Sequence, residues 1–591
     1  MKDFFKYVGA TVVGIIVFTI IATALSIMSI VGMVASQQAT KSVDKNSVLV
    51  LNLDGIMNEQ AEETSSILSQ FNDNESLGLQ EMLAAITKAK NNDNIEGIYI
   101  EAGALGADMA QMQELRDALA DFKKSGKWII AYGEVYSKGS YYVASVADKI
   151  YLNPSGIISW NGIGGELMFY KDLYAKVGIK VVPIKVGKYK SATEVFTEDK
   201  MSGPSREQTE RYINGWWQTM CQAVSQSRGI SVDELNTLAD QMLDLQDPKT
   251  FAKLKLIDGL LYNDQVKDVV KKRLKLGKDD LISQVSVADM AHVPEKAKGD
   301  EIAVYYAYGE IVDEAKPQDL FSQGHQIVAD KVCDDLADLA DDDVIKAVVI
   351  RVNSGGGSAY ASEQIWRAIE LLKKKKPVVV SMGGAAASGG YYMSAGANYI
   401  YAEPTTLTGS VGIFGLYQDN SELLTKKLGL KFDEVKTNRN ATFGALGHPL
   451  TAEQVGYLQS SVDRGYLLFK QRVAEGRKLT MAEVEERAQG HVFLGSDALK
   501  LKMVDALGGI DKAVAKAAAL AKVKEYYMAP YPAPEDLLTQ IINDMAGTKG
   551  SKLDEYMRTT LGVLYEPYKV MQTANQQHFL QARIPFMLKV N

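Results

Sequence analysis

Residues that bind metals or cross-link chains are scarce in this sequence. Two cysteines, Cys221 and Cys333, occur among 591 residues, and they match neither a metal-ligand spacing nor a disulfide framework. The histidines are scattered, with no HExxH motif and no paired spacing: His292, His325, His448, His491 and His578. The sequence therefore supports no metal site and no histidine-based triad, and we expect no cofactor.

Positive charge is not in excess either. The chain carries 65 lysine and arginine residues against 73 aspartate and glutamate residues. No basic stripe of the kind that binds nucleic acid stands out, so no nucleic-acid partner is expected. Hydrophobic residues make up 46% and charged residues 23% of the chain, as in an ordinary globular protein. A chain of this length is too long to fold around a single hydrophobic core, and about three or four domains are expected.

Long apolar runs are absent except near the amino terminus. Residues 8–35 form a run of 28 residues without a charge, and about 20 such residues span a bilayer. Lys2 and Lys6 precede the run and the next basic residue is Lys41, which predicts that residues 1–7 stay in the cytoplasm. We expect a signal anchor in contact with membrane lipid, with the rest of the chain outside the cytoplasmic membrane. The alternative is a cleavable signal peptide, whose apolar region usually has only about 7–15 residues.

Two long segments of the chain look like copies of one unit. Each has a strand, a helical pattern and another strand in succession, the order of a right-handed βαβ unit on a parallel sheet. At a constant offset of 250, Tyr141 aligns with Tyr391 and Pro154 with Pro404. We therefore predict an α/β fold with two tandem domains.

Polar and proline-containing stretches of the sequence indicate the domain bounds. We predict an N-terminal α/β repeat over residues 47–290 and a C-terminal α/β repeat over residues 301–524, with a polar, proline-containing break between them. The tail over residues 525–591 has the pattern of amphipathic helices with no assignable role.

The two copies differ in the residues that carry chemistry. Only the second has a glycine-rich turn, NSGGGS at residues 353–358, and only the second has Ser388, where the first has Lys138. Loss of one active site after duplication would produce this difference. We therefore expect chemistry mainly in the second half.

The turn at residues 353–358 lies between a predicted strand and a predicted helix, where backbone N–H groups point outward. Glycine allows an acyl group to approach such groups, which would then form an oxyanion hole. A phosphate cradle is disfavoured because the Walker lysine and the GxGxxG pattern are missing. A tight turn without a chemical role is the structural alternative.

Ser388 stands in a similar place one strand later, in the stretch GGAAASGGYY. A serine at the start of a helix is most often an N-cap, and as a nucleophile it would need a base. The GxSxG pattern of α/β-hydrolases is not matched. Lys185, Lys188 and Lys190 of the first copy are candidate bases, since burial can make a lysine neutral. Pattern alone does not choose among the three.

Several stretches together resemble the signal peptide peptidase A (protease IV) family in its long, duplicated form. They are RVNSGGGS, MGGAAASGGYYMSAGANYI, PTTLTGSVGIFG, AQGHVFLGSDAL and VGKYKSATEVFTEDKMS. The resemblance covers the chain from the anchor to about Lys524. It implies a crotonase-like α/β spiral in each repeat, shared with the proteolytic subunit of Clp protease. It also implies homo-oligomers, a tetramer for the duplicated form.

The resemblance implies a role for each candidate residue. Ser388 would be the nucleophile, Lys190 the general base, and Ser410 the residue that orients the lysine. Backbone N–H groups of three glycines would form the oxyanion hole: Gly389, Gly356 and Gly357. The family turn is usually NSPGGS, and Gly355 replaces its proline here, which makes the turn less rigid before folding.

Neither copy is complete by itself, because the serine lies in the second and the lysine in the first. We predict a membrane-anchored serine endopeptidase with a Ser388/Lys190 dyad, which degrades cleaved signal peptides at the outer side of the cytoplasmic membrane. One alternative is a crotonase-superfamily acyl-CoA enzyme, disfavoured because coenzyme A is intracellular. The other is a catalytically silent membrane scaffold, disfavoured because Ser388, Lys190 and Ser410 are all present.

Overall fold

A computed structural model describes residues 41–61, 77–294, 297–315, 325–532 and 581–583, with isolated residues at 6, 7, 14 and 18. Almost all of the predicted anchor at residues 8–35 and most of the predicted tail lie outside these ranges. Among the residues that are described, no helix is both long and apolar enough to cross a membrane.

The first repeat is built on a parallel seven-stranded sheet. Its strand order is β2-β1-β3-β4-β5-β7, with β8 beside β1. The strands are β1 (Ser47–Asn58), β2 (Leu77–Gly78), β3 (Ile95–Gly106), β4 (Trp128–Tyr136), β5 (Lys149–Ile158), β7 (Gly259–Leu260) and β8 (Gln284–Val285). Leu49, Leu51 and Leu53 alternate along β1 and therefore share one face of the sheet, where all three are fully buried.

The helices of this repeat begin where the sequence supplies caps. Asp108 and Gln111 form a capping box at the start of α3, and Ser202 caps the 26-residue helix α7, which ends at Gly229 with φ +67°. The helices are α2 (Leu79–Asn91), α3 (Met109–Lys123), α4 (Lys138–Ala144), α5 (Lys171–Val177), α6 (Glu194–Thr197), α7 (Gly203–Arg228), α8 (Val232–Ala239), α9 (Lys249–Lys253), α10 (Asn263–Leu274) and α11 (Val287–Ala291).

The second repeat has an eight-stranded sheet in the order β18-β16-β14-β12-β9-β20, with β15 beside β14 and β19 beside β15. Its strands are β9 (Asp300–Tyr308), β12 (Ile345–Ser354), β14 (Val378–Ala387), β15 (Tyr399–Ala402), β16 (Leu407–Gly409), β18 (Val492–Leu494), β19 (Ala506–Leu507) and β20 (Tyr526–Tyr531). Its helices are α12 (Ala329–Asp341), α13 (Ala359–Leu372), α14 (Gly389–Ser394), α15 (Ala452–Arg477), α16 (Met481–Arg487), α17 (Gly495–Lys500) and α18 (Ile510–Leu520). β20 lies just beyond the domain end predicted at residue 524.

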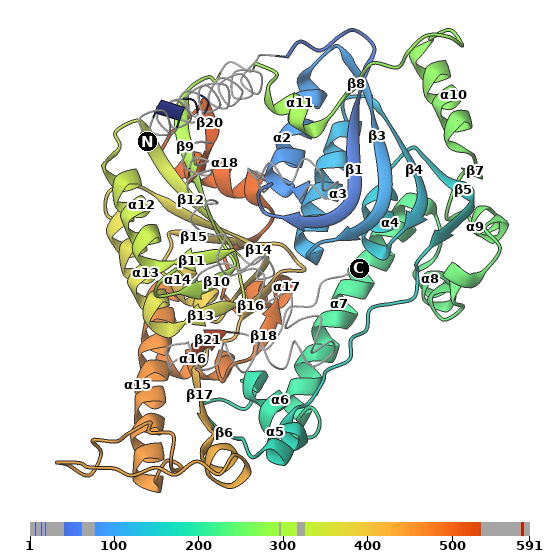
Figure 1. The fold of residues 1–591 in the computed structure, drawn as a ribbon. Coiled ribbons are helices and arrows are strands. Elements are labelled where there is room, and N and C mark those ends of the chain that lie inside the picture. Colours follow the sequence, from blue (N-terminus) through green and yellow to red (C-terminus); the bar gives the residue numbers. More distant parts are fainter. Residues whose placement is uncertain are drawn as a thin grey trace.

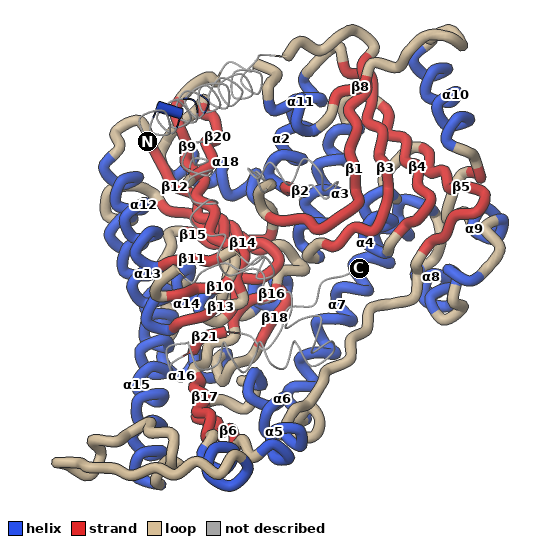
Figure 2. Tube along the Cα trace, in the orientation of Figure 1, coloured by secondary structure: helices blue, strands red, loops and turns tan. Residues whose placement is uncertain are grey.

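The elements of the two repeats correspond in order and in position. Helices α2 and α12 begin at residues 79 and 329, and α3 and α13 at residues 109 and 359, so both pairs are 250 residues apart. In Figures 1 and 2, α2, α3 and α18 lie between the strands of the first repeat and those of the second. The predicted duplication is therefore confirmed.

A third, six-stranded sheet joins the repeats. Its order is β11-β10-β13-β21-β17-β6, and its strands are β6 (Lys180–Lys185), β10 (Glu310–Val312), β11 (Gln326–Val328), β13 (Gly356–Ser358), β17 (Phe414–Asp419) and β21 (Gln581–Arg583). β6 of the first repeat pairs antiparallel with β17 of the second along its whole length, and Figure 1 shows them side by side at the bottom of the view. This pairing places the residues that follow Lys185 against the second repeat.

A buried charge cluster also ties the repeats together. Arg351 on β12 is fully buried, and its guanidinium lies 2.8 Å from Glu59 and 2.7 Å from Glu114, both of the first repeat. Glu403 of the second repeat is also buried and accepts a hydrogen bond from Gln113 at 3.0 Å. Burial and the neighbouring Glu114 raise the pKa of Glu403 to about 9.

Candidate active site

The segment that follows β6 places Lys190 against the second repeat. The Tyr189 N–H donates to the Gln489 carbonyl at 3.0 Å. Gly490 has φ +78°, and a Cβ added there would lie only 2.7 Å from the Lys190 backbone nitrogen. Glycine at position 490 is therefore required for this close approach of two chain segments.

The Lys190 amine meets two serines of the second repeat. Its Nζ lies 2.7 Å from Ser388 Oγ, 3.1 Å from Ser410 Oγ and 3.3 Å from the Ser410 carbonyl oxygen. No carboxylate among the described residues acts on the charge of Lys190, and Lys190 is 1% exposed. Burial, and secondarily the positive charge of Arg583, lower the pKa of Lys190 well below its usual value. Such an amine can be neutral near neutral pH.

Ser388 lies at the junction of β14 and α14 in an unusual backbone conformation. Its φ is +55° with ψ -113°, a region that costs a residue other than glycine about 1–3 kcal/mol. Its hydroxyl makes no capping hydrogen bond to α14, so the N-cap interpretation is wrong for this side chain. The hydroxyl is fully buried and points to the lysine instead.

Ser410 follows β16 and is also held at positive φ, +53°. Its N–H donates to the His491 carbonyl at 2.7 Å, and the Ser388 N–H donates to the neighbouring Gly409 carbonyl at 2.8 Å. Two backbone hydrogen bonds thus fix the two serines relative to each other and to the loop that receives Lys190.

The other candidate lysines lie elsewhere. Lys188 places its Nζ over the Tyr189 ring, 5.1 Å from the centroid, and Lys185 ends β6 opposite Phe414. Lys138, which aligns with Ser388, donates to Asn161 Oδ1 at 2.8 Å in the first repeat. Of the three lysines that the sequence left open, Lys190 is the one in contact with Ser388.

The glycines predicted for an oxyanion hole lie beside Ser388. Gly389 is the first residue of α14, so its N–H has no acceptor within the helix. Gly356 has φ +103°, and a Cβ added there would lie 2.8 Å from the Gly389 nitrogen. The Gly356 N–H itself donates to Ser354 Oγ at 3.1 Å, while Gly357 pairs with Ile311 in the third sheet. The two glycine turns therefore adjoin beside Ser388.

Sequence reasoning missed two parts of this site. The His491 ring stacks between Tyr189 and Phe493 with centroids 4.0 and 4.2 Å apart, and the stretch AQGHVFLGSDAL alone indicates no role for its histidine. Burial lowers the pKa of His491 to about 4. The second part, β21, comes from the tail, and three residues without periodicity carry no strand signal.

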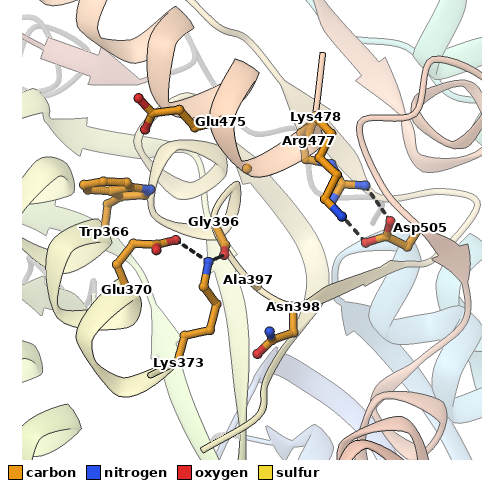
Figure 3. A pocket seen from close by; sticks show the side chains of 11 residues that line it. Trp366, Glu370, Lys373, Gly396, Ala397, Asn398, Glu475, Arg477, Lys478 and Asp505 are labelled. Carbon is orange, nitrogen blue, oxygen red and sulfur yellow. Dashed lines mark hydrogen bonds and ion pairs between the residues drawn. The ribbon is translucent and has the colours of Figure 1, made fainter. Parts of the chain in front are cut away.

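A surface pocket of about 390 Å³ lies away from the dyad, between α13, the end of α15 and residues 396–398 (Figure 3). On its wall, the two terminal nitrogens of Arg477 form a bidentate ion pair with the two carboxylate oxygens of Asp505, at 2.7 and 3.0 Å. None of the predicted site residues lines this pocket. The contacts of Lys190, and not this cavity, therefore locate the candidate active site.

Comparison with protein-family models finds two families that match this chain. The model of peptidase family S49 matches residues 121–277 and again residues 370–524, and the Clp protease model matches residues 301–406. A solved structure, a mutant of ClpP1 from Listeria monocytogenes, covers 36% of this chain and 94% of its own at a TM-score of 0.23 and 15% identity, a likeness too weak to carry an argument.

Relatives extend the similarity over most of the chain. Protease 4 of Salmonella typhi is 34% identical over 82% of this chain and 78% of its own length. Protease 4 of Haemophilus influenzae is 33% identical over 85% of this chain and 83% of its own. The chloroplastic serine protease SPPA of Arabidopsis thaliana is 30% identical over 89% of this chain and 76% of its own. With one family match in each repeat, the chain belongs to peptidase family S49 and is a serine peptidase with a duplicated, Clp-protease-like α/β fold.

Proposed function

We propose that the protein is a membrane-anchored endopeptidase in which Ser388 is the nucleophile and Lys190 the general base. The observation that supports this most strongly is the 2.7 Å separation of Lys190 Nζ and Ser388 Oγ inside a buried site. Activation of a hydroxyl needs an adjacent base, and a lysine serves when desolvation keeps it neutral.

The contacts of Lys190 define where its protons lie. A neutral amine has two N–H groups and one lone pair. The Ser410 carbonyl can only accept and takes one N–H, and the Ser410 hydroxyl takes the second. The lone pair then faces the Ser388 hydroxyl. Ser410 is thus a positioning residue, which turns the lone pair of the base toward the nucleophile.

The reaction follows from this arrangement. Ser388 Oγ attacks the peptide carbonyl while its proton passes to Lys190 Nζ, and the protonated lysine then gives that proton to the leaving amine. Water, deprotonated by the same lysine, hydrolyses the acyl-enzyme. The N–H of Gly389, which has no acceptor within α14, stabilises the negative oxygen of each tetrahedral intermediate. The turn at Gly356 and Gly357 lies beside it, and the Gly356 N–H takes part only when it leaves Ser354 Oγ.

The substrates we propose are apolar peptide segments in extended form, in particular cleaved signal peptides. The charge-free run at residues 8–35 supports this, since an anchor would hold the site next to the membrane where such peptides remain. In this proposal the N-terminus is cytoplasmic, the catalytic region lies outside the cytoplasmic membrane, and the chains assemble into a homo-oligomer, a tetramer.

Three variants of the full-length protein test the dyad against an apolar peptide substrate. Ser388→Ala and Lys190→Ala should each lower kcat/KM by at least about 100-fold, because each removes one partner of the proton transfer. Lys188→Ala is the control, since its amine contacts the Tyr189 ring and not the serine. Near-normal activity in either dyad variant, with folding unchanged by circular dichroism, would refute the assignment.

A further inference from the structure

The strand β14, which leads to Ser388, does not pair evenly with its neighbour β12. Val352 pairs with Met382. Two residues later Ser354 pairs with Ala386, so β14 advances four residues while β12 advances two. The extra residues form a bulge in β14. Because a bulge redirects the chain that follows it, the contacts that hold this bulge also set the position of Ser388.

The side chain of Asn353 bridges the bulge. Its Oδ1 accepts the N–H of Ala385, which lies within the bulge, at 3.0 Å. Its backbone carbonyl accepts the Gly309 N–H at 3.0 Å. Asn353 is also the first residue of the glycine turn at residues 353–358. One residue therefore connects the bulge before Ser388 with the turn that lies beside it.

Two carboxylates of the first repeat orient this amide. Asn353 Nδ2 donates to Glu59 Oε1 at 2.8 Å and to Asp108 Oδ2 at 2.9 Å. Glu59 is ion-paired with Arg351 at 2.8 Å, so its oxygens only accept hydrogen bonds. The NH2 group of the amide must then face the first repeat, and the amide oxygen must face the Ala385 N–H.

The bulge has room for these carboxylates because two glycines form part of it. A Cβ added to Gly384 would lie 2.3 Å from Asp108 Oδ2 and 2.4 Å from Asp108 Cβ. A Cβ added to Gly383 would lie 2.8 Å from Glu59 Oε1. The two glycines that open the stretch GGAAASGGYY therefore admit the first repeat to the strand of the nucleophile.

The first repeat has no counterpart of this side chain. At the constant offset of 250, Gly103 stands where the second repeat has Asn353, and Lys138 stands where it has Ser388. Strand β3 forms with Gly103 at that position, so the fold of a repeat does not require an asparagine there. The asparagine occurs in the copy that has the serine.

We propose that Asn353 is a positioning residue, which holds the bulge of β14 so that Ser388 meets Lys190, and that Glu59 and Asp108 orient it. The first repeat then contributes twice to the site, because it supplies the base and also aligns the strand of the nucleophile. This inference rests on the proposed function, since it needs Ser388 as the nucleophile. The hydrogen bonds of the amide act on β14, so they should change how fast the serine reacts and not the pH at which the base loses its proton.

Asn353→Asp in the full-length protein tests this role with a side chain of the same shape. Its second oxygen would face Glu59 and Asp108 and repel them, so the bulge must shift. We expect kcat on an apolar peptide to fall on the order of 100-fold, the cost of a misplacement by about 1 Å, and KM to stay within about threefold. Labelling of Ser388 by a fluorophosphonate should slow by a similar factor, with the pH midpoint of wild type. A merely structural role would lower the denaturation midpoint and leave kcat of the folded protein unchanged.

Two further variants separate the amide contacts from the added charge. When Asn353→Asp is combined with Asp108→Asn, a donor again faces an acceptor across this contact, and kcat should rise at least about tenfold above that of Asn353→Asp alone. Asn353→Gly copies the residue of the first repeat and removes the amide contacts without adding a charge. It should also lower kcat by at least about tenfold, and it provides the test if the aspartate variant does not fold.

Asn398→Asp is the matched control. Asn398 Oδ1 also accepts a backbone N–H of β14, from Val378 at 2.8 Å, at the end of the strand far from Ser388. At the aligned position of the first repeat, Asp148 accepts from β4 in the same way. The control variant should therefore keep kcat.

The same measurements distinguish this inference from the proposed function. If Ser388→Ala is inactive but folded Asn353→Asp and Asn353→Gly keep kcat within about threefold of wild type, the positioning role is refuted and the dyad stands. An equal loss in Asn398→Asp, or no recovery in the double variant, would also overturn the inference. If Ser388→Ala keeps wild-type activity, the proposed function itself fails.

Discussion

Lys190 Nζ and Ser388 Oγ lie 2.7 Å apart although 198 positions separate the two residues in the chain. The two residues meet because β6 of the first repeat pairs with β17 of the second. The site therefore exists only when both repeats are assembled, and contacts between the repeats become part of the catalytic arrangement.

Gly490→Ala should lower kcat/KM on the order of 100-fold, the cost of misplacing a catalytic group by about 1 Å. The added Cβ would lie 2.7 Å from the Lys190 backbone nitrogen and must push the segment that carries Lys190 away. Gly229→Ala is the matched control, because Gly229 also has positive φ (+67°) but nothing within 4 Å of an added Cβ. Gly229→Ala should lose about 1 kcal/mol of stability from backbone strain, and Gly490→Ala should lose more because its Cβ also clashes with the Lys190 backbone. Only Gly490→Ala should lose activity. Equal activities would show that the close approach at Gly490 does not position Lys190.

The ring at position 491 should matter for its shape and not for its charge. Its pKa of about 4 leaves the imidazole neutral above about pH 5, and the ring stacks on Tyr189, next to the base. We expect His491→Phe to keep kcat/KM within about threefold and His491→Ala to lower it by at least about tenfold, as removal of an aromatic contact loosens the segment. A pH profile of His491→Phe that matches wild type would support this role. An acid limb that disappears with the histidine would contradict it.

Glu403→Gln should stabilise the protein at neutral and mildly alkaline pH. The folded pKa of Glu403 is about 9 against 4.5 for the free group, so the folded state holds a proton that the unfolded state releases. The wild type therefore loses stability as the pH rises from 4.5 toward 9. The glutamine keeps an oxygen for Gln113 and needs no proton, so we expect a gain of roughly 1–3 kcal/mol at pH 7 to 8.

Chemical denaturation at two pH values checks this prediction. The difference between Glu403→Gln and wild type should nearly vanish at pH 4 and grow as the pH rises. A constant difference across the range, or a destabilised variant at pH 8, would show that Glu403 is ionised in the folded protein.

The sequence predicted the duplication well, because helices and strands recur at the same offset and their apolar periods are local features. The partner of Ser388 was identified from the family resemblance and not from the pattern, since the β6–β17 pairing joins segments with no shared periodicity. The alternative N-cap role of Ser388 failed because its positive φ turns the hydroxyl away from α14. The carboxyl groups of Glu59, Glu114 and Glu403 look like solvated charges in sequence, and only the assembled repeats bury them around Arg351.

The tail shows a different limit of sequence reasoning. Gln581–Arg583 forms a strand because it pairs with β13 on one side and with β17 on the other, and not because of its own propensity. Short strands of this kind depend on their partners, which a local pattern does not reveal.

The most direct test of the Ser388/Lys190 dyad is the rate at which a fluorophosphonate probe labels Ser388 as a function of pH. The full-length wild type should be labelled at a rate that rises with the fraction of neutral Lys190, with a midpoint well below 10.5, the value of a free lysine. Lys190→Ala should be labelled at least about 100-fold more slowly at neutral pH. Labelling of Lys190→Ala at the wild-type rate would contradict the role of Lys190 as the base.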